Sequence, residues 1–368
     1  MSIDLLIEGI ISELNIGLNY VYSILFLQLG LILIRQWYID KKSESRDKIA
    51  LGYGLYYLFL FVGTLIYFSI DTIDISGYYY EILFLISLIV IGIGGLVFTF
   101  TIENTIKKIL DTKFIISILF VILLIFIPII YYFETQFFYL LLGVLILVNV
   151  SLQIIFIVYF IHNTFGSIRK KLTYSLIGLV FSLIGLAFSS KMGIDILKKY
   201  LDTYYLIIFI SKFMTIFSLN LILYGLTGYS FLLESQWKEN LISLHIIDKK
   251  RHIDLFYRDF DESQKDDIRR EDLFAGGISG IVTVIKEITE SDELPDNIHK
   301  EDNLIMLEYG EKIITVMITR ANLLNARYFL KVITTQFEQY YLDYYDRWEE
   351  NAELFTPMNS IIKEIIKF

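Results

Sequence analysis

Three glycines in the stretch EDLFAGGISGIVTVIKEITES, Gly276, Gly277 and Gly280, have the residue type of a phosphate-binding loop. Glycines that directly follow a strand and open a helix let backbone N–H groups approach a phosphate. Here the polar connector DESQKDDIRRED separates the glycines from the nearest predicted strand, and no Gly-Lys-Ser/Thr follows them. The pattern therefore argues against nucleotide binding and places the glycines in the first turns of an amphipathic helix.

Lys212 lies within a long apolar run, where a charged side chain is costly and is a candidate for function. Thr215 and Ser218 follow it on nearly the same helix face. Three roles fit: an ammonium that reaches the outer interface, a counter-charge for a ligand, or a retinal-type Schiff base. A Schiff base needs a buried carboxylate nearby, and the third apolar run offers Glu81 and Glu103 at its ends only. The interfacial role is favoured, and the ligand-binding role stays open.

Amide side chains within the apolar runs form a second candidate group. Asn149 and Gln153 are four residues apart and share one helix face, and Asn220 and Asn19 lie in two other runs. Interhelical hydrogen bonding is the favoured role, and a polar ligand cavity is the alternative. The candidate ligand-binding residues are Asn149, Gln153, Lys212, Thr215, Ser218 and Asn220.

Composition excludes several kinds of chemistry. The chain has no cysteine, and its four histidines are scattered without an H-E-x-x-H pair. We therefore expect no catalytic residue, no metal site and no cofactor. Residues 1–235 carry 15 basic and 15 acidic side chains, so the whole net charge of −9 lies in residues 236–368. An acidic domain argues against nucleic-acid binding.

Seven apolar runs are long enough to cross a lipid bilayer, which takes about 20 residues. They cover approximately residues 14–34, 50–70, 79–101, 114–133, 137–162, 172–190 and 204–232. The acidic N-terminus differs from a signal peptide, so the first run is expected to remain as a span. On the sixth run, Ser175, Gly178, Ser182, Gly185 and Ser189 form a stripe of small residues that favours close approach of another helix.

The distribution of Lys and Arg predicts the orientation of the spans. Loops 1–2, 3–4 and 5–6 hold 11 of these residues, whereas the loops of the other side hold three. Positive charge marks the cytoplasmic side of a membrane. We expect a multi-pass protein of the cell membrane, with the N-terminus outside and the C-terminal domain in the cytoplasm.

The C-terminal domain, residues 236–368, has the pattern of a small α/β domain. Its predicted strands are 241–248, 253–260, 297–300, 303–309 and 312–319. Apolar residues at helical spacing predict a first helix with Phe274, Ile278, Ile281, Ile285 and Ile288 on its buried face. A second helix follows with Ala326, Leu330, Ile333, Phe337, Tyr340 and Tyr344, and a last one begins at Thr356 and Pro357. The order is ββ, helix, βββ, helix, helix.

This order resembles the longin fold of the longin/roadblock group. DLFAGGISGI (272–281) is similar to the opening of the first helix in archaeal longin-like proteins, and IIDKKRHIDLFYRDF is similar to their first hairpin. Arg251 and His252 replace the turn glycine of that hairpin and its neighbour. The resemblance implies a non-catalytic adaptor that pairs with a second copy or docks a Ras-like small GTPase or another longin/roadblock protein. The partner-interface residues would be Asp272, Phe274, Gly276, Gly277 and Gly280.

The expected architecture is thus a multi-domain membrane protein: an all-α bundle of seven transmembrane helices, residues 1–235, followed by the longin-like domain, 236–368. The expected function is that of a receptor-like or sensor-like protein, with signal transfer through residues 231–241. Two alternatives remain: a transporter or channel with a regulatory domain, and a retinal-type chromophore protein that uses Lys212. No run pairs two acidic residues in its middle, which disfavours transport.

Overall fold

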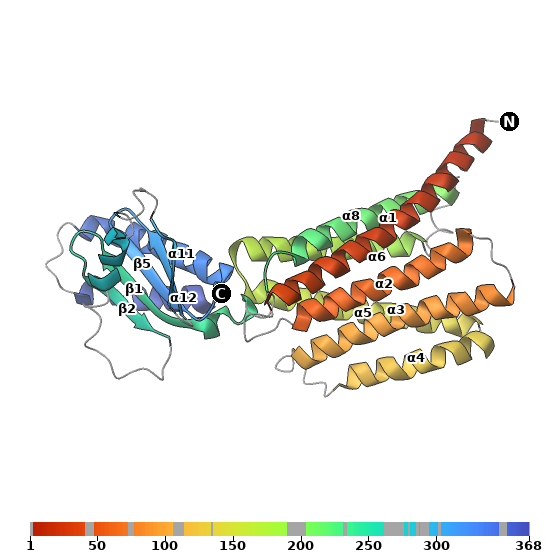
Figure 1. Ribbon diagram of the computed structural model, residues 1–368, viewed down its shortest axis with the longest axis horizontal. Helices are drawn as coiled ribbons and strands as arrows, with labels where there is room; N and C mark the ends of the chain where they lie inside the picture. Colours follow the sequence, from red (N-terminus) through yellow and green to blue (C-terminus); the bar gives the residue numbers. More distant parts are fainter. Residues whose placement is uncertain are drawn as a thin grey trace. The chain divides into compact units, whose positions relative to one another are not determined.

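The structure is a computed structural model that describes the chain in segments. These are residues 3–40, 48–72, 77–105, 114–133, 135–189, 204–230, 234–260, 276–278, 280–284, 287, 294–300, 303–345 and 352–367. The chain forms two compact units (Figure 1). The helical unit comprises Met1–His162 and Ser167–Leu232, and the sheet unit comprises Asn163–Gly166 and Leu233–Phe368. The sheet unit thus includes a short segment from between two predicted spans in addition to the C-terminal part of the chain.

The described residues of the helical unit form seven helices. They are α1 (Ile3–Asp40), α2 (Lys48–Thr72), α3 (Tyr78–Thr105), α4 (Ile115–Phe133), α5 (Thr135–Asn163), α6 (Gly166–Ser189) and α8 (Tyr204–Leu226). Each contains a segment long and apolar enough to cross a membrane, which confirms the seven predicted spans within the described residues. Helix α1 packs between α8 and α2, and α3 packs between α2 and α4 (Figure 1). The chain is therefore a multi-pass membrane protein by length and composition.

Helix α8 ends at Leu226, six residues before the predicted end of the seventh run. Gly228 has a positive φ of 91°, which a right-handed helix cannot contain. Two polar contacts hold the chain at this end: Tyr229 Oη donates to the carbonyl of Gly225 (2.6 Å), and Lys171 Nζ donates to that of Thr227 (3.3 Å). Hydrophobicity alone missed this helix end because the residues beyond it, TGYSFL (227–232), carry no charge.

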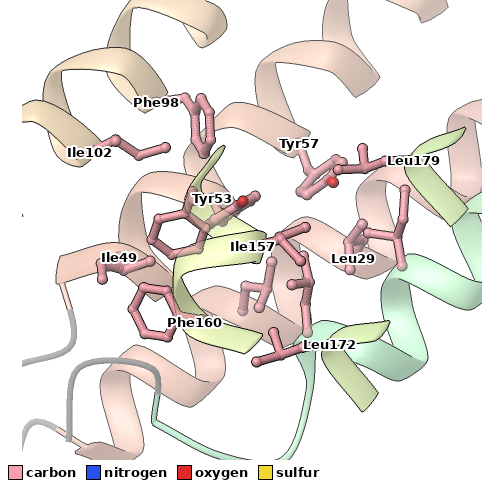
Figure 2. Close-up of a cluster of buried hydrophobic side chains, with 14 of the residues drawn as sticks. Leu29, Ile49, Tyr53, Tyr57, Phe98, Ile102, Ile157, Phe160, Leu172 and Leu179 are labelled. Atoms are coloured by element: carbon pink, nitrogen blue, oxygen red, sulfur yellow. The ribbon is translucent and has the colours of Figure 1, made fainter. Parts of the chain in front are cut away.

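Aromatic and aliphatic side chains from six helices form the core of the helical unit (Figure 2). The ring of Tyr53 meets that of Phe98 edge to face, with centroids 4.6 Å apart. Ile157 and Phe160 of α5 belong to the same core (Figure 2). By contrast, large apolar side chains such as Phe100 and Phe213 are exposed on the outer surface. Such an exterior is expected where lipid is the solvent.

The small residues of α6 permit close packing against α8, as predicted. A Cβ atom at Gly178 would lie 2.8 Å from the backbone oxygen of Ser218, and one at Gly185 would lie 2.7 Å from Thr215 Oγ1. Ser211 Oγ donates to the carbonyl of Gly185 (2.7 Å) across the same contact. Absence of side chains at these two positions therefore sets the distance between the helices.

The sheet unit contains a five-stranded antiparallel sheet in the order β2-β1-β5-β4-β3. The strands are β1 (Leu241–Asp248), β2 (Asp254–Asp259), β3 (Asn297–Lys300), β4 (Asn303–Tyr309) and β5 (Ile313–Thr319). The five predicted strands are confirmed to within a residue at each end, because short segments rich in apolar residues and bounded by polar turns identify them. A short 3₁₀ helix, η1 (Trp237–Asn240), leads into β1 and buries Trp237.

Helices α11 (Leu324–Tyr345) and α12 (Met358–Lys367), with the 3₁₀ helix η3 (Ala352–Phe355), pack against one face of the sheet. Their buried side chains include Ala326, Leu330, Ile333, Phe337 and Ile362. On the other face, Ile278 and Val282 pack with the sheet residues Ile247, Leu307, Ile314 and Val316. Residues 276–278, 280–284 and 287 are helical, so the predicted first helix of the sheet unit is present where it is described.

Two predicted helix faces need correction. Ile281, three residues after Ile278, was predicted to be buried but is 44% exposed. Val282, four residues after Ile278, lies on the buried face of the helix instead. Tyr340 is exposed for the same reason, and Tyr341 packs against Phe337. Phe274, Ile285, Ile288 and the side chain of Tyr344 lie outside the described residues.

The β1–β2 turn explains how the hairpin forms without its expected glycine. His252 adopts a positive φ of 56°, a conformation that favours glycine. Asp248 Oδ1 accepts hydrogen bonds from the backbone N–H groups of Lys250 (2.6 Å) and Arg251 (3.0 Å). The carboxylate therefore stabilises the turn and offsets the strain at His252.

Candidate functional site

A cavity of about 260 Å³ lies inside the helical unit, and all seven helices contribute to its wall. Helix α5 supplies Asn149, Val150 and Gln153, and α8 supplies Thr215. Aromatic side chains also line it: Tyr22, Phe26, Tyr56, Tyr57 and Phe120. Three of the six predicted ligand-binding residues, Asn149, Gln153 and Thr215, are thus brought together at one site.

The amide pair on α5 forms a polar network in the wall of this cavity. Gln153 Nε2 donates to Asn149 Oδ1 (2.8 Å) and to Tyr56 Oη (3.2 Å). Both side chains are buried, with exposed fractions of 6% for Asn149 and 3% for Gln153. The contact with Tyr56 links α5 to α2, so the predicted interhelical hydrogen bond is present.

One donor of the network is without a protein partner: Asn149 Nδ2 makes no hydrogen bond within the described residues. It lies 3.0 Å from the position that a Cβ atom on Gly95 would occupy, and Gly95 also lines the cavity. A buried polar group without a partner destabilises a protein by about 1–3 kcal/mol. The absence of a side chain at Gly95 thus keeps open the space beside an unsatisfied donor.

The hydroxyl groups of two threonines in the wall are already paired with backbone carbonyls. Thr215 Oγ1 donates to Ser211 (3.0 Å), and Thr64 Oγ1 donates to Leu60 (2.7 Å), each one turn earlier on its own helix. Such bonds are common for threonine in apolar helices. Both residues therefore contribute mainly shape and methyl surface to the cavity, and Asn149 is the stronger candidate for a polar contact to a ligand.

The remaining predicted ligand-binding residues lie elsewhere. Lys212 is half-buried, and its Nζ donates to the carbonyl of Asn15 on α1 (3.0 Å). Ser218 is fully buried but does not line the cavity, and the side chain of the exposed Asn220 donates to the carbonyl of Ile216. Helical spacing placed Lys212 and Thr215 on nearly the same face, but only the neighbouring helices determine which residue reaches the cavity.

Glu103, considered above as a partner for Lys212, has a different role. Its carboxylate accepts hydrogen bonds from the backbone N–H groups of Ile116 (3.1 Å) and Ser117 (3.0 Å) and from Ser117 Oγ. These groups lie in the first turn of α4, where N–H groups have no partner within the helix. Glu103 therefore caps α4 from α3, which explains a buried carboxylate without a chromophore.

Among the residues that the structure describes, the lining of the cavity includes no Asp, Glu, Lys, Arg or His. Transfer of an ion into such surroundings without a counter-charge is very unfavourable. The cavity is therefore suited to an uncharged, mainly apolar molecule, in agreement with the general character of small-molecule sites.

A second group of buried polar residues lies in the sheet unit, around Asn325 at the start of α11. Asn325 Oδ1 accepts from the backbone N–H of Phe165 (2.8 Å), and Asn325 Nδ2 donates to the carbonyl of Glu234 (3.0 Å). The carboxylate of Glu234 accepts from the backbone N–H groups of Leu324 and Asn325. We call Phe165, Glu234, Leu324 and Asn325 the Asn325 cluster. The sequence contained no signal for it, because its members are distant along the chain.

Close packing surrounds the Asn325 cluster, and its carboxylate is buried. The ring of Phe165 meets that of Trp237 edge to face, with centroids 5.6 Å apart. Gly166 has a positive φ of 55°, and a Cβ atom there would lie 2.7 Å from the ring of Tyr328. Burial raises the pKa of Glu234, and its hydrogen bonds from the N–H groups of Asn325 and Leu324 oppose that shift.

His245 has polar partners that the sequence did not disclose. Its Nδ1 lies 2.7 Å from Asp254 Oδ2, and its Nε2 lies 3.3 Å from Ser243 Oγ. Ser, His and Asp in this order are the components of a hydrolytic triad. Ser243 and His245 are each only 5% exposed, however, so a substrate could not reach the hydroxyl without movement of the sheet or its cover. The three residues instead connect β1 to β2.

The predicted partner-interface glycines are exposed on their helix. No atom of the described residues lies within 4 Å of the position that a Cβ atom on Gly276, Gly277 or Gly280 would occupy. The next turn adds two exposed apolar side chains, Ile281 (44%) and Val284 (51%). The glycines therefore do not pack onto their own sheet. Asp272 and Phe274 lie outside the described residues.

Comparison of the chain with family models, with curated protein sequences and with solved structures finds no match.

Proposed function

We propose that this chain is a receptor-like, multi-pass membrane protein. In this proposal the helical unit binds a small uncharged molecule, and the sheet unit is a non-catalytic platform for a protein partner. The cavity lined by seven helices around Asn149 carries the proposal, because a helix bundle without a ligand function has no need for an unsatisfied amide beside an open space. The loop charges support an N-terminus outside the cell and a cytoplasmic sheet unit.

Chain connectivity provides a route between ligand and partner. Helix α5 carries Asn149 and Gln153 and ends at Asn163, where the chain enters the sheet unit for the first time. Phe165 lies two residues further on, and its N–H donates to the side chain of Asn325. The same side chain donates to Glu234, which lies where the chain passes into the sheet unit for the second time. A shift of α5 upon ligand binding would thus act on the start of α11 through two intervening residues. This route adds to the expected one through residues 231–241.

The proposed partner is a Ras-like small GTPase or another longin/roadblock protein, a class suggested by the longin resemblance. The observed ββ, helix, βββ, helix, helix order supports the resemblance. The exposed glycines together with Ile281 and Val284 support a contact surface for such a partner. The expected location is the cell membrane.

The ligand-binding part is tested with the full chain purified in native lipid nanodiscs. Mass spectrometry of the denatured sample should detect an uncharged small molecule in stoichiometric amount. Val150→Phe places a ring in the cavity wall and should reduce that amount at least tenfold. Val144→Phe is the matched control, since Val144 is an exposed residue of the same helix outside the cavity. Equal amounts in the two variants would refute a ligand in this cavity.

The partner part is tested by binding of purified Ras-like GTPases, loaded with GDP or with a GTP analogue, to the full chain in nanodiscs. Ile281→Lys and Val284→Lys should weaken binding at least tenfold, because they place a charge on the exposed apolar face. Leu354→Lys, at an exposed leucine of η3, should leave binding unchanged. Loss of affinity in all three variants alike would argue against this surface.

A further inference from the structure

We infer that the cavity selects its ligand through one hydrogen bond, donated by Asn149 Nδ2 to a carbonyl oxygen of a planar, uncharged molecule. This inference rests on the proposed function and names the class of compound that the helical unit would bind. It follows from three observations: which donor is unpaired, which donors are already used, and which side chains surround them.

Asn149 is held in one orientation by its neighbour. Its Oδ1 accepts from Gln153 Nε2, which places the Nδ2 amide on the opposite side of the side chain. Gln153 has two N–H donors on Nε2, and its two hydrogen bonds, to Asn149 and Tyr56, use both. Gln153 is therefore a positioning residue, and Asn149 presents the donor.

An unpaired N–H₂ group recognises an acceptor and does not recognise a donor. A carbonyl oxygen has two lone pairs and no hydrogen, so it satisfies this group without leaving a polar atom of its own unpaired. An alcohol would also accept, but its hydroxyl hydrogen would need a further acceptor in a mostly apolar wall. The chemistry therefore favours a ketone, aldehyde, ester or quinone over an alcohol.

The wall around Asn149 favours a planar ligand. Rings of Tyr56, Tyr57 and Phe120 line the cavity together with Gly92 and Gly95 of α3. Aromatic rings pack well against flat π systems, and glycines leave a flat backbone surface. None of the described lining residues is charged, which argues against a carboxylate or ammonium group on the ligand.

Two probes of the same planar shape test the inference: 2-acetylnaphthalene, which has a carbonyl oxygen, and 2-isopropenylnaphthalene, in which a CH₂ group replaces that oxygen. Their binding to the full chain in nanodiscs is measured by equilibrium dialysis against empty nanodiscs, which corrects for partition into lipid. The wild-type chain should bind the ketone about tenfold more tightly than the hydrocarbon, since a buried donor would otherwise stay unpaired.

Three variants assign this preference to its donor. Asn149→Ala should bind both probes equally. Serine in Asn149→Ser has almost the same volume as the alanine of Asn149→Ala but carries a hydroxyl donor. Part of the preference for the ketone should therefore return. Asn220→Ala removes an exposed amide outside the cavity and should behave as the wild type. Because the readout is a ratio of two affinities, a general change in cavity size does not imitate the result.

Each other result has a defined meaning. Equal binding of the two probes by the wild type would overturn the inference but leave the cavity as a ligand site, in agreement with the proposed function. Persistence of the preference in Asn149→Ala would place the donor elsewhere and overturn the inference. Absence of binding above empty nanodiscs would also overturn it, while the co-purification experiment would still decide the proposed function separately.

Discussion

Two buried asparagines show how differently the two units treat polar groups. Asn325 of the sheet unit uses its side-chain oxygen, its side-chain nitrogen and its backbone N–H in hydrogen bonds to Phe165 and Glu234. Asn149 of the helical unit uses its side-chain oxygen, and its Nδ2 has no partner within the described residues. A satisfied amide rigidifies the groups that it joins, whereas an unsatisfied one favours occupation by a ligand. The comparison therefore assigns a structural role to Asn325 and a recognition role to Asn149.

The largest expected effect concerns Asn325. Asn325→Leu keeps the volume but leaves the N–H of Phe165 and the carbonyl of Glu234 buried without partners, so the sheet unit should lose about 2–4 kcal/mol. Hydrogen exchange of the amides of β1 and β5 should accelerate by roughly 30-fold to 1000-fold.

Asn303→Ala is the control for this change, because Asn303 is exposed at the start of β4. Its exchange rates should match the wild type. If Asn325→Leu also matched the wild type, the Asn325 cluster would have no role in stability, and the contrast with Asn149 would disappear.

A smaller effect is expected where helices α6 and α8 meet. Gly178→Ala directs a methyl group at the backbone oxygen of Ser218, 2.8 Å away, and should destabilise the helical unit by about 1–3 kcal/mol. Thermal unfolding in detergent, followed by circular dichroism, measures the change.

Gly143→Ala provides the matched helical control, since no atom of the described part of the chain lies within 4 Å of its added methyl group. It should be neutral or stabilise α5 by up to about 1 kcal/mol, because alanine is the better helix former. Similar unfolding temperatures for the two variants would contradict close packing as the function of the α6 stripe.

The β1–β2 turn should respond with an increase in stability. His252→Gly removes the cost of a positive φ and should stabilise the sheet unit by about 0.5–1 kcal/mol, as measured by urea unfolding. His252→Ala also removes the imidazole but keeps the strain, so it should show no such gain. Equal stability of the two variants would show that backbone conformation is not the limiting factor there.

The smallest effect concerns the pH dependence of the Asn325 cluster. Because burial raises the pKa of Glu234 above its ordinary value of 4.5, the folded sheet unit binds this proton more tightly than the unfolded chain does. The contribution of Glu234 to stability is therefore fully present below pH 4.5 and decreases as pH rises through the folded pKa.

Glu234→Gln should remove that slope. The difference in free energy of unfolding between wild type and variant, measured from below pH 4.5 upward, should fall as the pH rises through the folded pKa of Glu234 and then level off. A difference that rises with pH would mean that the N–H groups of Leu324 and Asn325 lower the pKa by more than burial raises it.

The two units also differ in how much of their structure could be predicted. In the sheet unit, the outer face of each helix is polar, so helical spacing located Ala326, Leu330, Ile333 and Phe337. The strands have apolar residues on both faces, and the polar turns between them marked their ends. In the helical unit, lipid replaces water, so inner and outer faces are equally apolar. Span length was predictable there, and the small residues of α6 identified one helix contact, but the set of residues that line the cavity was not.

The sequence by itself determined the seven membrane-length helices, the five strands and the residue types available for binding. It did so because hydrophobic length and periodicity are local properties of a chain. Only the tertiary structure separated Asn149, Gln153 and Thr215 from Lys212, Ser218 and Asn220, since a helix face acquires its role from the helices beside it. The Asn325 cluster could not be predicted for a similar reason. Its hydrogen bonds join residues that are 90 or more positions apart, and a local sequence pattern contains no information on such pairs.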